Sequence, residues 1–190
     1  SGTLKASHHQ MNRAALSALA CRCRLRGIPR STATAGTMHE HAALAAQLQE
    51  HILAHIPLAR AMQLQVARYD GAELEIRAPL APNINDKGCA FGGSMASLMT
   101  LAGWGLVELA LRARGIACDI YVGDSQLRYR EPLWGELRAL ARFDGEVALD
   151  AFLENLSGRG KARIGVACAI AGDGRDAATL DAAFVARLRT

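Results

Sequence analysis

Two consecutive glycines, Gly92 and Gly93, stand where a loop passes into a long apolar segment. A glycine pair that opens a helix leaves backbone N–H groups without partners, and the helix dipole adds positive potential there. Such a site could stabilise an oxygen that gains negative charge during a reaction, with the N–H of Gly93 or Ser94 as donor. A tight turn that needs glycine accounts for the same pair equally well. The pair alone leaves both interpretations open.

Such a reaction would also need a base, and Asp124 is the best candidate. Simple strand alternation puts Asp124 on one face with Ile120 and Val122, and Ser125 on the other, unless a bulge intervenes. A carboxylate on an inward face is unfavourable without partners, which makes it a candidate for function. A strand-end turn beside Gly123 is an equally good interpretation.

Cysteine and histidine residues offer weaker candidates. Cys89 lies in the loop before the glycines, but no histidine follows His55 to activate it, so we expect an inert thiol. His51 and His55 have the spacing of a helical metal pair, yet no third ligand is evident, and we expect surface histidines and no metal site. The five cysteines, of which only Cys21 and Cys23 are close together, indicate reduced thiols in a cytoplasmic protein.

The first elements predicted after the amino-terminal segment are a helix and a hairpin. Apolar residues repeat with helical spacing from residue 39 until Pro57 ends the helix. Residues 62–66 and 74–76 alternate in polarity around Asp70-Gly71, which is a strong hairpin signal.

The glycine pair itself lies between a long loop and a long helix. Residues 79–93 contain two prolines and three glycines, so they predict an irregular loop, and long loops in compact domains are often functional. Residues 94–114 have almost no polar face, and we expect a helix that is covered on nearly every side. Strands are predicted within 117–143 and at 161–171, a short amphipathic helix at 146–157, and either a strand or a helix at 177–188.

One apolar helix with five or six strands predicts the α+β class, with a curled antiparallel sheet wrapped around the helix 94–114. This domain covers residues 39–190. Residues 1–38 form a separate leader, which we expect to be disordered, with Met38 as the functional start. Residues 11–21 also have the pattern of a short signal peptide, and an organellar targeting segment fits the composition too. Ser1 in place of a start methionine suggests that the first residues are a remnant of cloning.

Charge is distributed unevenly along the chain. Residues 1–39 carry six basic and no acidic residues, while residues 40–190 carry 16 basic and 18 acidic residues. The domain therefore has no basic surplus for phosphate groups, and nucleic-acid binding is not expected. No uninterrupted apolar run reaches 18 residues, so we expect no membrane-spanning helix.

Four segments in the right order carry a resemblance to a known family. Residues 85–93 resemble the N-x-x-G-x-x-H-G-G element of acyl-CoA thioesterases of the hot-dog superfamily. Residues 79–85, 91–94 and 101–104, and Asp124-Ser125 with Tyr129 and Pro132, are similar to the YiiD-type thioesterase domain. The resemblance covers residues 42–190. It implies a hot-dog fold, a homodimer with a site between subunits, possible further pairing into a dimer of dimers, and no cofactor except coenzyme A as part of the substrate.

The implied activity is hydrolysis of acyl-CoA or acyl-carrier-protein thioesters. In this sequence, however, Phe91 stands at the position of the family's histidine, and Thr100 at that of its helix carboxylate. The resemblance and the remaining polar residues together predict two sets of site residues. The catalytic set, expected to converge in one cleft, is Asn85, Gly93 and Asp124, and the substrate-binding set is Phe91, Gly92, Ser94, Thr100, Ser125 and Tyr129.

Two other functions remain open. The missing histidine and carboxylate favour a non-catalytic module that binds acyl thioesters or mediates dimerisation. A hot-dog dehydratase would need a His–Asp pair, and the domain lacks a histidine after residue 55.

Overall fold

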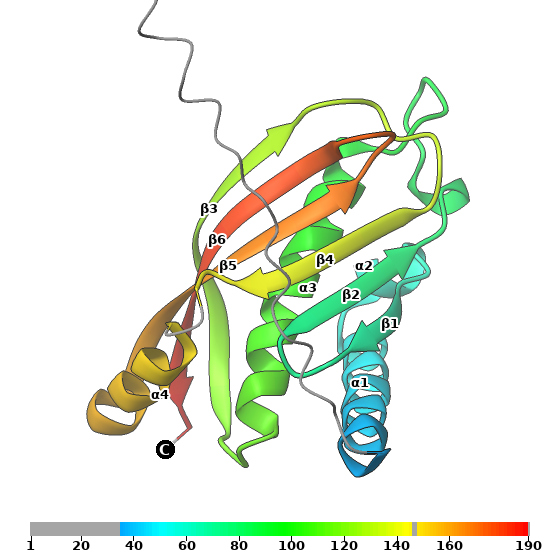
Figure 1. Cartoon of the computed structure of the whole chain (residues 1–190). Coiled ribbons are helices and arrows are strands. Elements are labelled where there is room, and N and C mark those ends of the chain that lie inside the picture. The colour runs from blue at the N-terminus through cyan, green and yellow to red at the C-terminus, as the bar shows by residue number, and fades with distance from the viewer. Residues whose placement is uncertain (1–34, 146–147, 190) are drawn as a thin grey trace, which may run out of the picture. The chain divides into compact units, whose positions relative to one another are not determined.

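The computed structural model describes residues 35–145 and 148–189, within a compact unit that spans Ala33–Thr190 (Figure 1). In chain order, its elements are α1 (Ala35–His55), α2 (Pro57–Ala61), β1 (Gln65–Tyr69), β2 (Glu73–Ala78), the 3₁₀ turn η1 (Ala81–Asn83), α3 (Gly92–Arg112), β3 (Cys118–Tyr129), β4 (Leu137–Phe143), α4 (Ala148–Arg159), β5 (Lys161–Ala171) and β6 (Asp176–Leu188).

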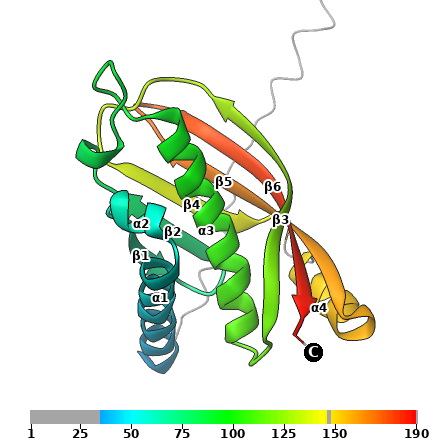
Figure 2. The ribbon, with the colours of Figure 1, turned by 180° about the vertical axis from the view of Figure 1, so that it is seen from behind.

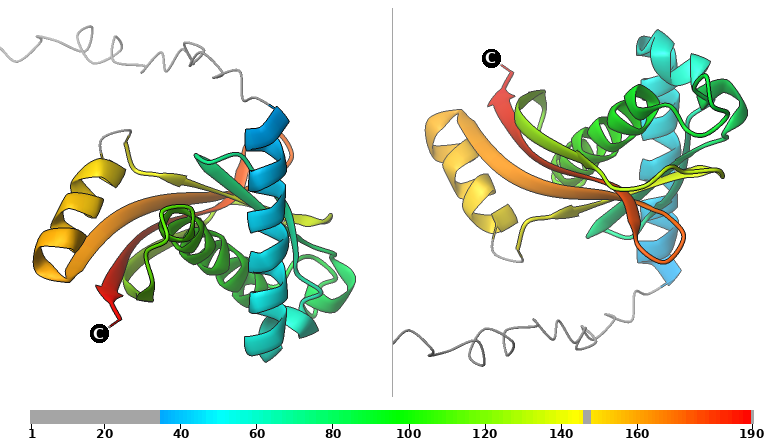
Figure 3. Two further views of the ribbon diagram at one scale, coloured as in Figure 1. Left: turned by 90° about the horizontal axis from the view of Figure 1, so that it is seen from below. Right: turned by 90° about the horizontal axis from the view of Figure 1, so that it is seen from above.

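The strands form one antiparallel sheet in the order β1-β2-β4-β5-β6-β3. Helix α3 packs against β2, β3, β4, β5 and β6, and α1 packs against β1 at one end of the sheet (Figures 1 and 2). Seen end-on, the sheet curls over α3, while α4 lies beyond β5 (Figure 3). The predicted architecture, a curled sheet around one long helix, is confirmed.

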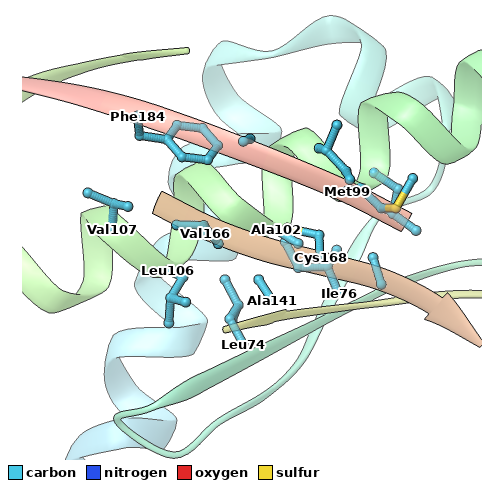
Figure 4. Close-up of a cluster of buried hydrophobic side chains, with 14 of the residues drawn as sticks. Leu74, Ile76, Met99, Ala102, Leu106, Val107, Ala141, Val166, Cys168 and Phe184 are labelled. Atoms are coloured by element: carbon cyan, nitrogen blue, oxygen red, sulfur yellow. The ribbon is translucent and has the colours of Figure 1, made fainter. Parts of the chain in front are cut away.

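The core lies between α3 and the inward face of the sheet (Figure 4). Alternate residues of β5 and β6 point into it, and these residues are Ala162, Ile164, Val166, Cys168, Ile170, Ala178, Leu180, Ala182, Phe184 and Ala186. Two glycines let α3 approach its neighbours closely. A Cβ at Gly103 would lie 2.8 Å from the Phe184 ring, and one at Gly105 would lie 2.9 Å from Leu74. The packing therefore requires glycine at positions that helix propensity disfavours.

One face of α3 is only partly covered. Ser97, Thr100, Leu101, Trp104 and Glu108 follow one another at helical spacing and are all half-buried. The single chain leaves this stripe half-covered, so the expected enclosure of the helix by the sheet together with a dimer mate stays a prediction there. The Trp104 ring is half-buried and lies 6.1 Å from the His51 ring, stacked on it. The helix is long and apolar enough to cross a membrane, but 61% of that window is buried in the domain, so core packing accounts for its composition.

The boundaries of the helices differ from the predicted ones. The long helix spans Gly92–Arg112 rather than 94–114, so the glycine pair forms its first turn. Helix α1 begins at Ala35, inside the segment assigned to the leader. Residues 1–34, with the signal-peptide pattern and the two close cysteines, lie outside the described residues, and so do residues 146 and 147 of the predicted short helix.

Two strand predictions also change. The predicted first strand, residues 62–66, is a turn until Gln65, because Gln63 takes a positive φ of 55° and the Leu64 N–H bonds to the Ala59 carbonyl at 3.0 Å. Met62 and Leu64 are nevertheless buried, as their alternation predicts. The segment left open between strand and helix, residues 177–188, is the strand β6.

Candidate functional site

The amino terminus of α3 presents unpaired hydrogen-bond donors. The first helical bond runs from the Met95 N–H to the Phe91 carbonyl at 3.1 Å. Within the described part of the chain, the N–H groups of Gly92, Gly93 and Ser94 have no acceptor. Phe91 is the N-cap and gives no side-chain cap. These three donors, with the positive end of the helix dipole, can hold an anion or a carbonyl oxygen.

The loop before α3 is anchored by Asn83, which is 1% exposed. Its side-chain Nδ2 donates to the backbone carbonyls of Met62 at 3.0 Å and Pro79 at 2.8 Å. Its backbone carbonyl accepts the Phe91 N–H at 2.7 Å. Its Oδ1 is buried and has no partner in the described residues. Asn83 was not among the predicted site residues, although its place directly after Pro82 in the loop was a usable signal.

Asn85 is a turn residue of the same loop. Its Oδ1 accepts the Lys87 N–H at 2.8 Å, and its Nδ2 donates to the buried Cys89 Sγ at 3.1 Å. Both ends of the amide are therefore engaged within residues 85–89, which gives Asn85 a role in shaping the loop. Its predicted part in catalysis stays a prediction.

Two aromatic rings pack against the glycine pair at the helix start. The Phe91 ring reaches within 2.3 Å of the point where a Cβ at Gly93 would lie, and the Tyr129 ring reaches within 3.2 Å of the corresponding point at Gly92. Tyr129 also donates its hydroxyl hydrogen to the Gly92 carbonyl at 2.8 Å. The glycine pair thus accommodates the chain's own rings, and the Phe91 ring lies where a side chain at position 93 would lie.

Asp124 does not join this site within the chain. A bulge between Val122 and Asp124 makes Gly123 an extra residue, so Asp124 lies opposite Ala183, on the sheet face away from α3. Its carboxylate is 76% exposed and lies 3.6 Å from Arg163. The prediction that Asp124 shares the inward face with Val122 is wrong, because the bulge reverses the alternation.

The bulge moves two other predicted residues to favourable places. Ser125 lies opposite the buried Ala182 and therefore belongs to the helix-facing row of β3. Tyr129 lies in the same row, at the end of β3 next to the helix start. Of the predicted residues, the structure brings together Phe91, Gly92, Gly93, Ser94 and Tyr129.

A cavity of about 300 Å³ accompanies Asp124 on the outer face of the sheet. Asp144 and Asp181 line it too, over a floor that includes Gly165 and Ala183. Asp181 is already paired with Arg128 at 2.8 Å. This cavity is separate from the donors of α3, since it lies on the opposite face.

Carboxylates are absent from the first four turns of α3. Glu108 is the one acidic residue of the helix, and Arg112 pairs with it at 2.6 Å. At 1.5 Å per residue, Glu108 lies roughly 24 Å along the axis from Gly92. Thr100, on the half-buried stripe, has no ionisable group. Among the described residues, the first four turns of α3 therefore supply hydrogen-bond donors and no carboxylate that could act as a base.

Thiols and histidines do not form a metal centre in the described residues. Cys89, Cys118 and Cys168 are buried free thiols. Burial raises the pKa of Cys168 to about 12, which keeps it protonated. Burial, then the positive charge of Arg112, lowers the pKa of His51 below its ordinary value.

Comparison with known proteins identifies the family. The family described as "Putative thioesterase (yiiD_Cterm)" matches residues 45–188. The chain belongs to this family. Its fold is accordingly the hot-dog fold, in which the long helix is α3 and the sheet around it is the one described above.

Similar solved structures agree with this assignment. A protein of unknown function from Chlorobaculum tepidum TLS is 30% identical, with a TM-score of 0.76 over 78% of this chain and 97% of that chain. A "putative thioesterase" from Shewanella oneidensis is 29% identical, with a TM-score of 0.68 over 78% of this chain and 99% of that chain. A "probable thioesterase" from Pseudomonas aeruginosa, PA5026, is 22% identical with a TM-score of 0.65 over 78% and 95%, and it supports the fold alone.

Proposed function

We propose that the protein hydrolyses acyl thioesters of coenzyme A or acyl carrier protein at the amino terminus of α3. The observation that carries this proposal is the set of three unpaired N–H groups at Gly92, Gly93 and Ser94. Membership of a thioesterase family supports it. The reaction needs no metal or redox cofactor.

The donors would act on the thioester carbonyl. Its oxygen would lie against the N–H groups and gain negative charge as water attacks the carbonyl carbon. Because the charge grows in the transition state, the donors stabilise that state more than the bound substrate. A preorganised donor of this kind typically contributes about 10²–10³ in kcat.

The absence of a base at the helix start shapes the expected rate. General-base assistance typically contributes about 10²–10⁴. Since Asp124 lies on the outer face, we expect hydrolysis that depends on carbonyl polarisation and is correspondingly slow. This feature also favours the second candidate function, a module that binds acyl thioesters without hydrolysing them.

We propose further that the protein forms a homodimer through β3. At the other edge of the sheet, α1 covers β1, and the Val66 N–H is taken by Gln49 Oε1 at 2.8 Å. At the outer edge of β3, a strand of 12 residues, no other strand of the described residues pairs with it, and Tyr121 and Val122 there are 58% and 45% exposed. An unprotected strand of this length favours pairing with a second copy. In a continuous antiparallel sheet, Asp124 of either copy would remain on the outer face.

Release of free thiol from a panel of acyl-CoA and acyl-carrier-protein thioesters tests the enzyme directly. Turnover above the uncatalysed rate for any member supports a hydrolase. Binding of a non-hydrolysable CoA analogue, measured by calorimetry, without turnover of any thioester would favour the binding module instead.

A further inference from the structure

Each N–H at the start of α3 shares a peptide group with the carbonyl of the residue before it. The Gly93 N–H therefore shares a group with the Gly92 carbonyl, and the Ser94 N–H shares one with the carbonyl of Gly93. In the described residues, both carbonyls accept a side-chain hydroxyl, from Tyr129 at 2.8 Å and from Ser97 at 2.9 Å. A hydrogen bond to the carbonyl polarises the peptide group and makes its N–H a stronger donor.

The bond from Ser97 is the ordinary one of the two, because serine in a helix commonly donates to the carbonyl four residues earlier. The bond from Tyr129 instead joins the end of β3 to the start of α3. It is not needed as a helix cap, since at an amino terminus the carbonyls have helical partners and the N–H groups lack them. Its effect therefore falls on the peptide group that carries the Gly93 N–H.

Tyr129 is held in place from the sheet and packs on the helix. Its backbone pairs with Ala178, and the next residue, Arg130, donates its N–H to the Ala177 carbonyl at 2.8 Å. On the helix side, a Cβ at Gly92 would lie 3.2 Å from the ring carbon Cζ of Tyr129 and 3.3 Å from the hydroxyl oxygen. Glycine at position 92 thus lets the hydroxyl approach the carbonyl of that same residue.

We propose that Tyr129 is a positioning residue, whose hydroxyl orients and polarises the Gly92–Gly93 peptide group so that the Gly93 N–H binds the thioester carbonyl more strongly. This inference rests on the proposed function. Tyr129 acts through the peptide group and does not touch the reacting atoms. The hydroxyl holds the plane of the peptide group from the carbonyl side, and the N–H on the other side stays open to the substrate.

The expected effect follows from the strength of the donor. A bonded neighbour strengthens a hydrogen bond by roughly 10–30%. For a donor that contributes about 10²–10³ in kcat, this corresponds to about 2–8-fold. Tyr129→Phe removes the hydroxyl and keeps the ring, so we expect kcat for acyl-CoA hydrolysis to fall by about 2–8-fold. KM should change little, because the donor gains most when charge develops on the oxygen.

Tyr121→Phe is the matched control on the same strand. It removes a hydroxyl on the sheet face away from α3, since the neighbouring Val122 pairs with the buried Phe184. It should leave kcat unchanged, and thermal melting should show both variants folded. A kcat in Tyr129→Phe within about 1.5-fold of the wild type would overturn the proposal.

A second comparison asks whether Tyr129 acts through the Gly93 N–H. In a Gly93→Ala background the N–H remains, and Tyr129→Phe should still lower kcat by about 2–8-fold. In a Gly93→Pro background the N–H is gone, and Tyr129→Phe should have no further effect. A hydroxyl that only stabilised the fold would lower kcat equally in both backgrounds, and that result would overturn the proposal.

A failure of the proposed hydrolysis can be told apart from a failure of this inference, because nuclear magnetic resonance observes the peptide group without turnover. The ¹³C′ resonance of Gly92 and the ¹⁵N resonance of Gly93 should shift in Tyr129→Phe and stay in place in Tyr121→Phe. If the wild type hydrolyses no thioester, the affinity for S-(2-oxopentyl)-CoA, measured by calorimetry, replaces kcat. Shifted resonances with weaker binding in Tyr129→Phe support the inference. Unchanged resonances, equal affinity or no binding overturns it.

Discussion

Replacement of Gly103 by alanine tests how closely α3 approaches the sheet. The new Cβ would lie 2.8 and 2.9 Å from two ring carbons of Phe184 and 3.2 Å from Cys168 Sγ. Phe184 is fully buried, and Cys168 is 3% exposed. Neither side chain has solvent to move into, so the helix and the sheet must separate or the ring must leave its rotamer.

The magnitude follows from two opposing terms. Alanine in place of glycine favours a helix interior by about 1 kcal/mol. Overpacking of a dense core costs about 1–3 kcal/mol, and contacts below 3.0 Å to two ring atoms point to the upper part of that range. We therefore expect Gly103→Ala to destabilise the domain by about 1–2 kcal/mol in the free energy of unfolding.

Urea denaturation of Gly103→Ala beside Gly93→Ala provides the assay. Gly93→Ala adds a Cβ at 2.3 Å from a ring, but that ring belongs to the half-exposed Phe91, which can turn outward. We expect Gly93→Ala to stay within about 0.5 kcal/mol of wild type, as for a surface substitution. A double variant with Phe184→Leu should recover part of the loss. Equal stability of the two alanine variants would refute the close helix–sheet contact.

Three further predictions concern chemistry, assembly and pH. Asp124→Asn should leave thioester turnover unchanged, whereas loss of a general base would lower it by about 10²–10⁴. Val122→Lys on the edge of β3 should shift the mass measured by light scattering from dimer to monomer. The control variant Gln65→Lys, on the edge that α1 covers, should leave the mass unchanged. A monomeric wild type would contradict the pairing through β3. The lowered pKa of His51 means that the unfolded chain binds this proton more readily, so stability should fall as pH drops through about 6.5. His51→Gln should reduce this loss of stability, measured as the free energy of unfolding at a series of pH values. Identical pH dependence in the variant and the wild type would show that His51 does not cause the loss.

The sequence was sufficient for the parts of the fold that depend on periodicity. The long apolar run predicts the buried helix α3, because a helix without a polar face must be covered by other elements. The Asp70-Gly71 pair predicts the β1–β2 hairpin, because Asp-Gly favours the turn types whose twist matches that of paired strands. The ends of elements were less predictable. Gln63 at positive φ stops β1 from starting earlier, and no residue preference indicates that conformation.

The site was predictable in composition but not in arrangement. The glycine pair correctly marked the helix start. The strand face of Asp124 depended on one extra residue, and Gly123 was the available signal because glycine within a strand often marks a bulge. The contact of Phe91 with Gly93 depends on a side-chain rotamer and on the loop anchored by Asn83. A contact of this kind is set by tertiary structure and leaves no periodic pattern in the sequence.

The central claim is that the N–H groups at the start of α3 hold the thioester carbonyl, and Gly93→Pro compared with Gly93→Ala tests it most directly. Both variants place a Cβ against Phe91, but only proline removes the N–H, and proline is tolerated in the first turn of a helix. Both should retain the wild-type fold by circular dichroism. We predict that kcat for acyl-CoA hydrolysis is about 10²–10³ lower in the proline variant than in the alanine variant. Equal kcat in the two variants would contradict the claim.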